Sequence, residues 1–513
     1  MGKQAIVKKG GPFIEVSADG TRPLPAGDYG TLEKPLFYTH NKFQYGGAGS
    51  YDRFSGGRHN ITHEQRRLFQ YDTKGRFVCQ KGFYPRIRDL LVGMGYQVVF
   101  VDNDEPKPEK VYTANWDRIF ERFELRPMQD QCLAQIDMHD CGLIDAPPAF
   151  GKTHVMAMVA CMYPHAKIDI VTKRKDVVTR IKNLLTRWVP SVGMVGGGKK
   201  DKNRRVTVYT ADSLHHSDFD ADILLADEAH ELMTDRLAER LGQYWRSRNY
   251  CFTATPDMRL DNAHHRMEGI FGPRIFQMTQ QQAEECGLVS HVYVQWLDVD
   301  CGGINPIENL QQLVAQKRNG IWRNQWRNQV IVEAARSFLQ DQQQVLILVD
   351  TVDHALNLRQ LMPEASLCYS EGAVDSVKHA RYVRQGLLTP EELMTPERRV
   401  MLGQQFERRE LMCVIATGVW STGVSFDSLN VLIRGDGGDS DTFNVQIPGR
   451  VCRVDPKTGK EAGILIDLND IWDSKFQNRT MNRRRAYHKR GWTQMLANGE
   501  VWQPGMRTRR AGF

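Results

Sequence analysis

The stretch that decides the fold is Ala146-Pro147-Pro148-Ala149-Phe150-Gly151-Lys152-Thr153, which lies between two apolar segments. The preceding segment, 142–145, predicts a short strand, and the apolar run 152–161 predicts a helix. A turn between a strand and a helix N-terminus presents several backbone N–H groups to one anion. We expect the eight residues to bind the phosphates of ATP, with Lys152 on the β and γ oxygens and the Thr153 hydroxyl on Mg²⁺.

A pair of acids supports this interpretation. Asp227-Glu228-Ala229-His230 begins 75 residues after Lys152 and directly follows the apolar run 223–226. Two acids at the end of a buried strand are costly unless a cation or a proton transfer uses them, and ligands of open α/β sheets bind at the carboxyl ends of the strands. We expect Asp227 to hold Mg²⁺ and Glu228 to orient a water molecule and accept its proton.

Length and composition bound the class of protein. The chain has 513 residues, enough for two or three domains that each bury a core, and its apolar fraction of 41% is ordinary for a globular protein. No run of about 18 apolar residues and no secretory segment is present, so we expect a cytoplasmic protein without a membrane partner. The ten cysteines show no metal-ligand spacing and are expected to be reduced packing residues.

Positive charge is concentrated in two segments. Residues 34–88 hold eleven Lys and Arg against three acids, and residues 474–513 hold ten against one. These segments have net charges of +8 and +9. Because the whole chain has a net charge of +7, the rest of the chain has a net charge of −10. Basic segments of this kind indicate a polyanion partner such as nucleic acid, although a solvated charged face is the alternative.

The pattern of strands and helices predicts four parts. Residues 1–118 read as a small basic α+β domain that contacts nucleic acid, with strands at 76–79 and 96–101 around a helix at 85–94. Residues 119–295 and 296–472 each alternate apolar strands with helical patterns, which predicts two doubly wound parallel sheets. Residues 473–513 read as a basic tail.

Two basic runs have no single interpretation. Gly196-Gly197-Gly198-Lys199-Lys200 looks like a phosphate loop, but it precedes a strand, so a mobile basic hairpin is favoured. The run 483–492 interleaves bases with aromatic residues, which fits either a segment that grips a strand of nucleic acid or a solvated basic helix. The insertion 386–399 reads as a surface excursion.

The motifs resemble those of superfamily 2 helicases of the DEAH-box type over residues 122–470. Besides the loop and the acid box, the resemblance rests on four strings: Arg126-Pro127-Met128-Gln129, Thr253-Ala254-Thr255, Ala416-Thr417-Gly418 through Thr422-Gly423-Val424-Ser425-Phe426-Asp427, and Gln446-Ile447-Pro448-Gly449-Arg450-Val451-Cys452-Arg453. The resemblance implies two RecA-like domains behind the small N-terminal domain.

The same resemblance implies roles for further residues. Arg450 and Arg453, with Gln446 one helical turn earlier, would complete the catalytic site as arginine fingers, although surface ion pairs are the alternative. Four residues outside the loop would bind the nucleotide: Arg126, Gln129, Gly423 and Asp427. Three residues would couple hydrolysis to movement: His230, Thr253 and Thr255. Four residues would contact the nucleic-acid backbone: Thr172, Lys173, Thr210 and Thr417.

A closer resemblance is to phage branch-migration helicases of the UvsW type and their XPB-like relatives. It rests on Phe252 to Pro256 with Arg259, on Phe271-Gly272-Pro273, on Arg327-Asn328, on the triple glycine and on the run from Gly75 to Val98. In that family the N-terminal domain contacts duplex DNA. The resemblance also implies a phage-encoded protein. Pro148 and Ala149 depart from the common loop.

The sequence therefore predicts an ATP- and Mg²⁺-dependent DNA helicase or branch-migrating translocase in recombination, repair or replication. Three rivals stay open: an RNA helicase, the motor subunit of a restriction system, and a nucleotide-gated DNA clamp that does not hydrolyse ATP.

Overall fold

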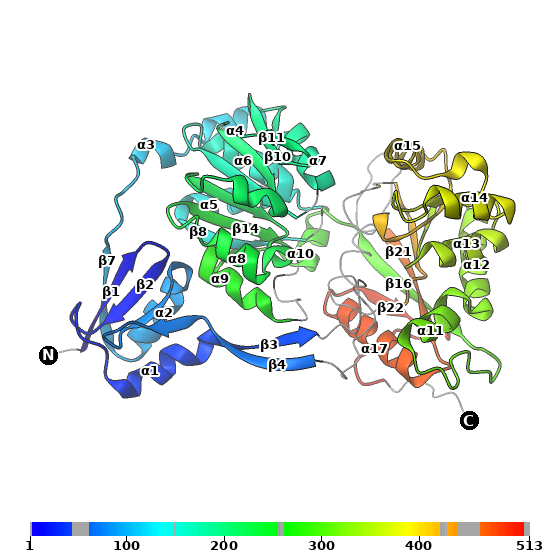
Figure 1. Ribbon diagram of the computed structural model, residues 1–513, viewed down its shortest axis with the longest axis horizontal. Helices are drawn as coiled ribbons and strands as arrows, with labels where there is room; N and C mark the ends of the chain where they lie inside the picture. The colour runs from blue at the N-terminus through cyan, green and yellow to red at the C-terminus, as the bar shows by residue number, and fades with distance from the viewer. Residues whose placement is uncertain are drawn as a thin grey trace. The chain divides into compact units, whose positions relative to one another are not determined.

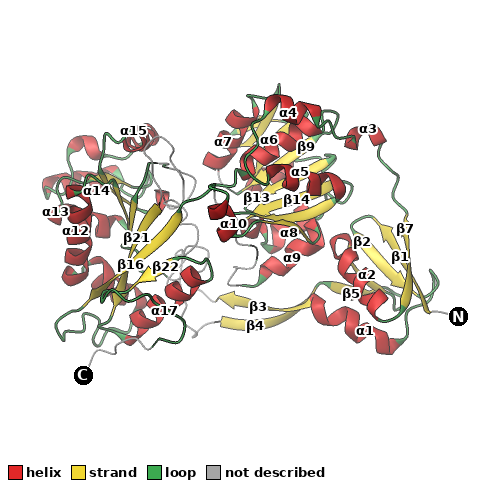
Figure 2. Cartoon of the chain, turned by 180° about the vertical axis from the view of Figure 1, so that it is seen from behind, coloured by secondary structure: helices red, strands yellow, loops and turns green. Residues whose placement is uncertain are grey.

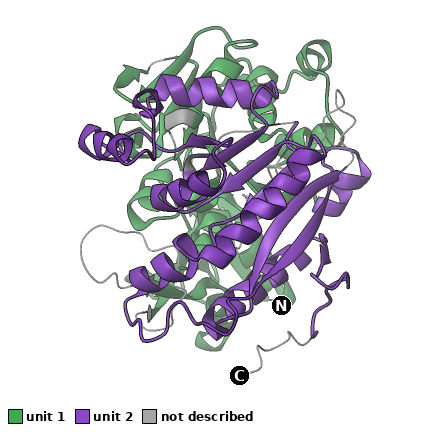
Figure 3. Cartoon of the chain, turned by 90° about the vertical axis from the view of Figure 1, so that its right-hand side faces the viewer, with its two compact units in different colours: residues 1–48, 59–279 green, residues 49–58, 280–513 purple. Residues whose placement is uncertain are grey.

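The computed structural model describes residues 3–43, 61–147, 149–173, 175–202, 204–254, 256, 261–420, 426, 428–438 and 462–506. The chain divides into two compact units, residues 1–48 with 59–279 and residues 49–58 with 280–513 (Figure 3). No helix among the described residues combines the length and the hydropathy needed to cross a membrane.

The N-terminal part of the first unit contains a five-stranded sheet with the order β5-β6-β2-β1-β7 and a separate two-stranded ribbon, β3-β4 (Figure 1). Its strands are β1 Lys3–Gly10, β2 Phe13–Ser17, β3 Phe37–Phe43, β4 Ile61–Arg67, β5 Phe69–Tyr71, β6 Phe77–Gln80 and β7 Tyr96–Asp102. Its helices are α1 Ala26–Glu33, α2 Tyr84–Gly93 and α3 Glu109–Tyr112. The strands and the helix predicted between 76 and 101 are confirmed as β6, α2 and β7.

Alternating side chains build the core of this part. Ala5 and Val7 of β1 and Ile14 and Val16 of β2 are fully buried, because every second residue of a strand faces the same side of the sheet. Leu91 of α2 joins the same cluster. Phe77 stacks on Phe69 with ring centroids 5.1 Å apart.

The N-terminal part is joined to the following sheet by specific contacts. The half-buried Lys81 ammonium donates to the Trp245 carbonyl at 2.5 Å and the Ser247 carbonyl at 3.2 Å. Burial lowers the pKa of Lys81 to about 8. Gly82 lies against the Glu268 carbonyl so closely that a Cβ would overlap it. Arg86 and Glu268 form a two-pronged ion pair at 2.6 Å.

An eight-stranded sheet with the order β11-β10-β12-β9-β13-β14-β8-β15 forms the rest of the first unit. Its strands are β8 Cys141–Asp145, β9 Ile168–Thr172, β10 Val192–Gly196, β11 Lys199–Asp201, β12 Val206–Thr210, β13 Ile223–Asp227, β14 Arg248–Thr253 and β15 Arg274–Gln277. Every pairing is parallel except that of β11 with β10. The helices are α4 Asp117–Arg122, α5 Gln129–Met138, α6 Lys152–Met162, α7 Lys175–Leu185, α8 Asp235–Leu241 and α9 Arg266–Phe271, with 3₁₀ helices η4 Ala211–His216, η5 Ala229–Leu232 and η6 Ala263–His265.

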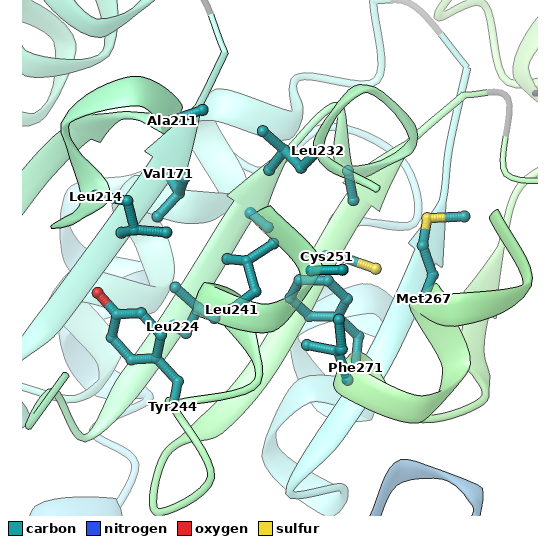
Figure 4. Close-up of a cluster of buried hydrophobic side chains, with 14 of the residues drawn as sticks. Val171, Ala211, Leu214, Leu224, Leu232, Leu241, Tyr244, Cys251, Met267 and Phe271 are labelled. Carbon is teal, nitrogen blue, oxygen red and sulfur yellow. The ribbon is translucent and has the colours of Figure 1, made fainter. Parts of the chain in front are cut away.

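Helices cover both faces of this sheet (Figure 2). On one face the buried residues of β9, β13 and β14 pack against η4, α8 and α9, and Figure 4 shows Leu224, Leu241 and Phe271 in that cluster. Burial on both faces explains the continuous apolar strands, since all five residues of β13 are buried.

The second unit contains a seven-stranded, all-parallel sheet with the order β18-β19-β17-β20-β21-β16-β22. Its strands are β16 His291–Val299, β17 Val345–Leu348, β18 Ser366–Cys368, β19 Cys413–Ala416, β20 Val431–Arg434, β21 Ala462–Asp470 and β22 Thr493–Met495. Its helices are α10 Gln280–Glu285, α11 Leu313–Lys317, α12 Gln325–Gln340, α13 Val352–Leu361, α14 Ser376–Arg384, α15 Pro396–Glu407 and α17 Ser474–His488, with a π-helical turn at Arg318–Trp322 and short 3₁₀ turns at Pro390–Glu392 and Gly418–Trp420. The prediction of two parallel-sheet domains behind a small N-terminal domain is confirmed.

The structure differs from the expected divisions at two places. The compact units divide after Thr279, and β16 crosses the expected boundary at residue 295 to pair with β21 of the second sheet. The segment expected as a basic tail forms α17 and β22 of that same sheet.

Buried hydrogen bonds explain why α17 is part of the domain. Arg483 is 1% exposed and donates to Asp467 of β21 at 3.0 Å. The Tyr487 hydroxyl donates to the same carboxylate at 2.7 Å and accepts from Arg434 at 2.8 Å. The arginine-rich run is therefore partly interior, so the expectation of a solvated basic helix is wrong, and its contact with nucleic acid stays a prediction.

Candidate nucleotide site

The loop after β8 turns through two left-handed residues. Ala149 has φ 73° and Gly151 has φ 88°, a conformation that favours glycine. A Cβ on Gly151 would also lie 2.9 Å from Gln129 Nε2. The turn delivers Lys152 as the first residue of α6, so the helix N-terminus faces the loop as the sequence predicts.

Arg126 and Gln129 hold the loop from outside. The Arg126 guanidinium donates to the Ala149 carbonyl at 2.9 Å, and the buried Gln129 amide donates to the Phe150 carbonyl at 2.8 Å. Gln129 also accepts from the Arg126 backbone N–H at 3.0 Å. These two side chains fix the shape of the loop, while the nucleotide contact expected of them stays a prediction.

The lysine and the acid pair meet at the carboxyl edge of the sheet. The Lys152 ammonium donates to the Ala146 carbonyl at 3.3 Å and lies 3.6 Å from a Glu228 oxygen. Glu228 is left-handed, with φ 47°. Burial, with help from the neighbouring Glu228, raises the pKa of Asp227 well above its ordinary value. A buried carboxylate of this kind favours a proton or a cation beside it.

His230 connects the acid box to the next strand. Its Nδ1 lies 2.8 Å from the Thr253 hydroxyl and 3.5 Å from a Glu228 oxygen. The Thr253 carbonyl accepts from the Ala146 N–H at 3.1 Å. Because β14 lies between β13 and β8, Thr253 touches both the acid box and the start of the phosphate loop.

The residues predicted to contact nucleic acid lie at strand ends. Thr172 and Thr210 are paired neighbours at the carboxyl ends of β9 and β12. Both are almost fully buried, and the Thr210 hydroxyl donates to Ser213 at 2.9 Å. Lys173 is exposed, and Thr417 follows β19 in the second unit. Their contact with nucleic acid stays a prediction.

Comparison with known proteins agrees with this site. The family model for "Type III restriction enzyme, res subunit" matches residues 122–258, which include the loop, the acid box and Thr253. The chain is 25% identical over 169 residues to DNA 3'-5' translocase XPB2 of Sulfurisphaera tokodaii. That match covers 32% of this chain and 38% of the relative, so less than half of the relative's length is spanned.

Solved structures show the same fold. A fragment of a putative HsdR subunit of a type I restriction enzyme from Vibrio vulnificus has a TM-score of 0.52 and 14% identity, covering 91% of this chain and 94% of that chain. S. cerevisiae Dbp5 bound to RNA and ADP BeF3 has a TM-score of 0.50 and 12% identity, covering 76% and 92%. At these identities the solved structures show the fold, and the family model and the translocase relative each match only part of the chain. T4 UvsW covers 96% of this chain and 99% of its own at 14% identity, and its TM-score of 0.41 carries no argument about a closer subfamily.

Several residues to which the sequence analysis assigned roles lie outside the described residues. They are Pro148, Thr255, Gly423, Asp427, Gln446, Arg450 and Arg453. Their assigned roles stay predictions.

One acid beside the phosphate loop was not singled out from the sequence. Asp145 ends β8, and its carboxylate lies 3.6 Å from the Arg274 guanidinium and accepts from the Gln277 amide at 3.4 Å. Its backbone carbonyl accepts from the Met278 N–H, which closes the sheet beside the phosphate loop. An acid that ends an apolar strand is the same signal that identified Asp227.

Proposed function

We propose that the chain is an ATP-hydrolysing motor that moves along DNA as a helicase or branch-migrating translocase. The observation that carries the proposal is the contact series from Lys152 through Glu228 and His230 to Thr253. These residues come from three chain segments that the fold brings to one strand edge. They link a phosphate-binding lysine, an acid and a strand in one structure.

The residues present fit Mg·ATP. The left-handed loop presents a helix N-terminus, the Lys152 ammonium keeps a donor beyond its bonds to Ala146 and Glu228, and Asp227 is a buried carboxylate that favours a cation. Thr153 and Asp227 would hold the metal ion. When bound, Mg²⁺ neutralises charge on the phosphate oxygens.

The protein groups divide the work of hydrolysis. Lys152 binds the transferring phosphate, and Glu228 orients the attacking water and accepts its proton. His230 orients the Glu228 carboxylate, and through its contact with Thr253 it transmits a movement of that carboxylate to β14. Arg450 and Arg453 would stabilise the charge that develops on the phosphoryl group.

DNA is favoured over RNA as the nucleic acid along which the motor moves. The relative with the similar motor region is named a DNA translocase, and the basic N-terminal part offers phosphate contacts. RNA is the alternative because backbone contacts do not distinguish the two nucleic acids well, and the structural neighbour Dbp5 was solved with RNA. A restriction-system motor subunit is the second alternative, supported by the family model and the HsdR fragment.

The test is the steady-state ATPase rate of the full chain with single-stranded DNA, duplex DNA, a four-way DNA junction or single-stranded RNA. We expect the DNA substrates to stimulate turnover more than RNA, with the junction giving the largest effect. A preference for RNA would move the proposal to RNA remodelling. Stable co-purification with a methyltransferase would favour the restriction motor.

The same assay separates the motor from a nucleotide-gated clamp. A clamp would bind DNA with steep salt dependence, yet no nucleic acid would raise its ATPase rate. That pair of results would contradict the proposed function.

A further inference from the structure

A basic pocket of the first unit lies between the β10–β11 hairpin and the end of η4. It has a volume of about 290 Å³ and is lined by residues of the β10–β11 hairpin, of η4 and of the turn after η4: Val195, Lys200, Lys202, His215, His216, Ser217 and Asp218. Four of the seven are lysine or histidine. The nucleotide site uses none of these residues.

The triple glycine positions the hairpin that forms one wall. Gly197 and Gly198 are the two residues between the paired Gly196 and Lys199, and both have positive φ, as a type I′ turn requires. A Cβ on Gly196, whose φ is 144°, would lie 2.6 Å from the Thr210 side chain. Glycine therefore lets the hairpin close onto the end of β12.

The other wall continues from that same strand end. Thr210 is followed directly by η4, whose last two residues are His215 and His216. Their rings lie 3.9 Å apart between centroids. The pocket is thus next to Thr210, which is paired with Thr172 at the edge predicted to contact nucleic acid.

The charges of the pocket favour an anion. The Lys202 ammonium binds Asp218 at 3.0 Å and the His216 carbonyl at 3.4 Å, so its charge is largely balanced. Within the described residues the exposed Lys200 ammonium has no hydrogen-bond or ion-pair partner. Partial desolvation and the neighbouring His215, Lys200 and Lys202 hold the pKa of His216 below its ordinary value, which an anion in the pocket would reverse.

We propose that the pocket formed by Lys200, His215 and His216 binds a backbone phosphate of the nucleic acid on which the motor acts. The inference rests on the proposed function, because the nucleic acid must pass the strand edge at Thr172 and Thr210. Both walls adjoin Thr210, the hairpin through Gly196 and η4 through its first residue, so the pocket is within reach of a nucleic-acid strand bound at the two threonines. On this proposal, the Gly-Gly-Gly-Lys-Lys run helps to bind a phosphate of the nucleic-acid backbone and not a phosphate of the nucleotide.

The test compares two neighbouring lysines of one hairpin. Lys200 lines the pocket, whereas Lys199 is exposed on the same strand outside it and is the matched control. The full-length Lys200→Ala and Lys199→Ala variants are titrated with a labelled oligo(dT) strand and a labelled duplex from about 50 to about 200 mM salt. Both substitutions are at exposed positions, and a thermal melt checks that each variant folds.

We expect Lys200→Ala to weaken binding about fivefold to tenfold near 0.1 M salt and to reduce the slope of log K against log salt by about 0.7 to 0.9, the value of one phosphate contact. Lys199→Ala should leave the slope unchanged. Equal losses in both variants would mean a generally basic hairpin and would overturn the proposal. No loss in Lys200→Ala would overturn it too.

A second variant, His216→Gln, keeps a hydrogen-bonding side chain of similar size but cannot take a proton. The wild type should bind DNA more tightly as pH falls from about 8 to about 6, because imidazolium is favoured beside a phosphate. His215, Lys200, Lys202 and Asp218 face His216, so their charges are shared by both proteins. The variant should lose most of that gain, and an unchanged gain would contradict the assignment.

Competition with inorganic phosphate tests whether the pocket binds a phosphate of the nucleic-acid backbone or a free anion. Competition by millimolar phosphate that disappears in Lys200→Ala, together with the loss in DNA affinity, supports a backbone site. Phosphate binding with unchanged DNA affinity would mean a free-anion site and would overturn the proposal. If the wild type binds no nucleic acid at low salt, the proposed function itself fails.

Discussion

Replacing Asp169 with asparagine should change how the stability of the first unit depends on pH. Asp169 of β9 is 2% exposed, and one of its oxygens accepts from Ser217 at 3.0 Å and from the Tyr244 hydroxyl at 2.7 Å. Burial raises the pKa of this carboxyl from 3.8 to about 6. The folded protein therefore holds the proton more tightly than the unfolded chain does.

The direction and size of the effect follow from that difference. The protonated Asp169 carboxyl contributes fully to the free energy of unfolding below about pH 4, and this contribution is lost as pH rises through about 6. At 1.36 kcal/mol for each pKa unit, the difference between 3.8 and about 6 corresponds to about 3 kcal/mol. Asparagine does not titrate. The free energy of unfolding of Asp169→Asn, measured relative to the wild type, should therefore rise by about 3 kcal/mol between pH 4 and pH 7.5.

The variant has an opposing cost that does not depend on pH. Its carbonyl oxygen can accept from both hydroxyls, but its N–H₂ takes the place of the Asp169 oxygen that has no hydrogen-bond partner within the described structure. An unsatisfied buried donor costs about 1–3 kcal/mol. Asp169→Asn should be the less stable protein near pH 4 and at least equal to the wild type near pH 7.5.

The assay is urea unfolding at several pH values, with the transition of the first unit assigned by hydrogen exchange of peptides from β9 and β13. Asp140→Asn is the control, because its side chain is 83% exposed and pairs with Arg248. A stability difference between Asp169→Asn and the wild type that stays constant from pH 4 to 7.5 would refute the reasoning.

Three further substitutions test other parts of the structure. Gly82→Ala places a Cβ against the Glu268 carbonyl, so the N-terminal part should become protease-sensitive while the nucleotide site stays folded; unchanged proteolysis would contradict the packing. Arg483→Ala leaves Asp467 charged and buried and should destabilise the second unit by about 3–5 kcal/mol in urea unfolding, whereas a loss under 1 kcal/mol would argue against the network. Thr253→Val removes the 2.8 Å contact with His230 and should lower DNA-stimulated turnover several-fold with little change in nucleotide affinity; loss of nucleotide binding instead would disprove the coupling role.

Much of the fold follows from local patterns. Strands buried on both faces, such as β13, are mostly apolar runs, and the loop between β8 and α6 has the residue spacing of a phosphate-binding loop. The acid pair was found because two carboxylates at the end of a buried strand need a chemical reason. Each of these patterns lies within a short segment of the chain, so it can be recognised in the sequence without the structure.

What the sequence did not show depends on distant contacts. The burial of Arg483 requires Asp467 of another strand, and no local feature distinguishes it from the exposed arginine expected of a basic tail. The same holds for Lys81, which is half-buried by the loop before β14. The basic pocket arises only when the hairpin and η4 are brought together at the end of β12.

The central claim is that this site hydrolyses ATP in response to DNA. The most direct measurement is the ATPase rate of the wild type and of Glu228→Gln, each with and without saturating DNA, beside nucleotide binding by both proteins. We expect DNA to stimulate the wild type strongly, and Glu228→Gln to bind nucleotide without turnover, because the amide keeps the shape of the site but cannot accept a proton. Equal turnover by the two proteins, or a wild-type rate that no DNA raises, would contradict it.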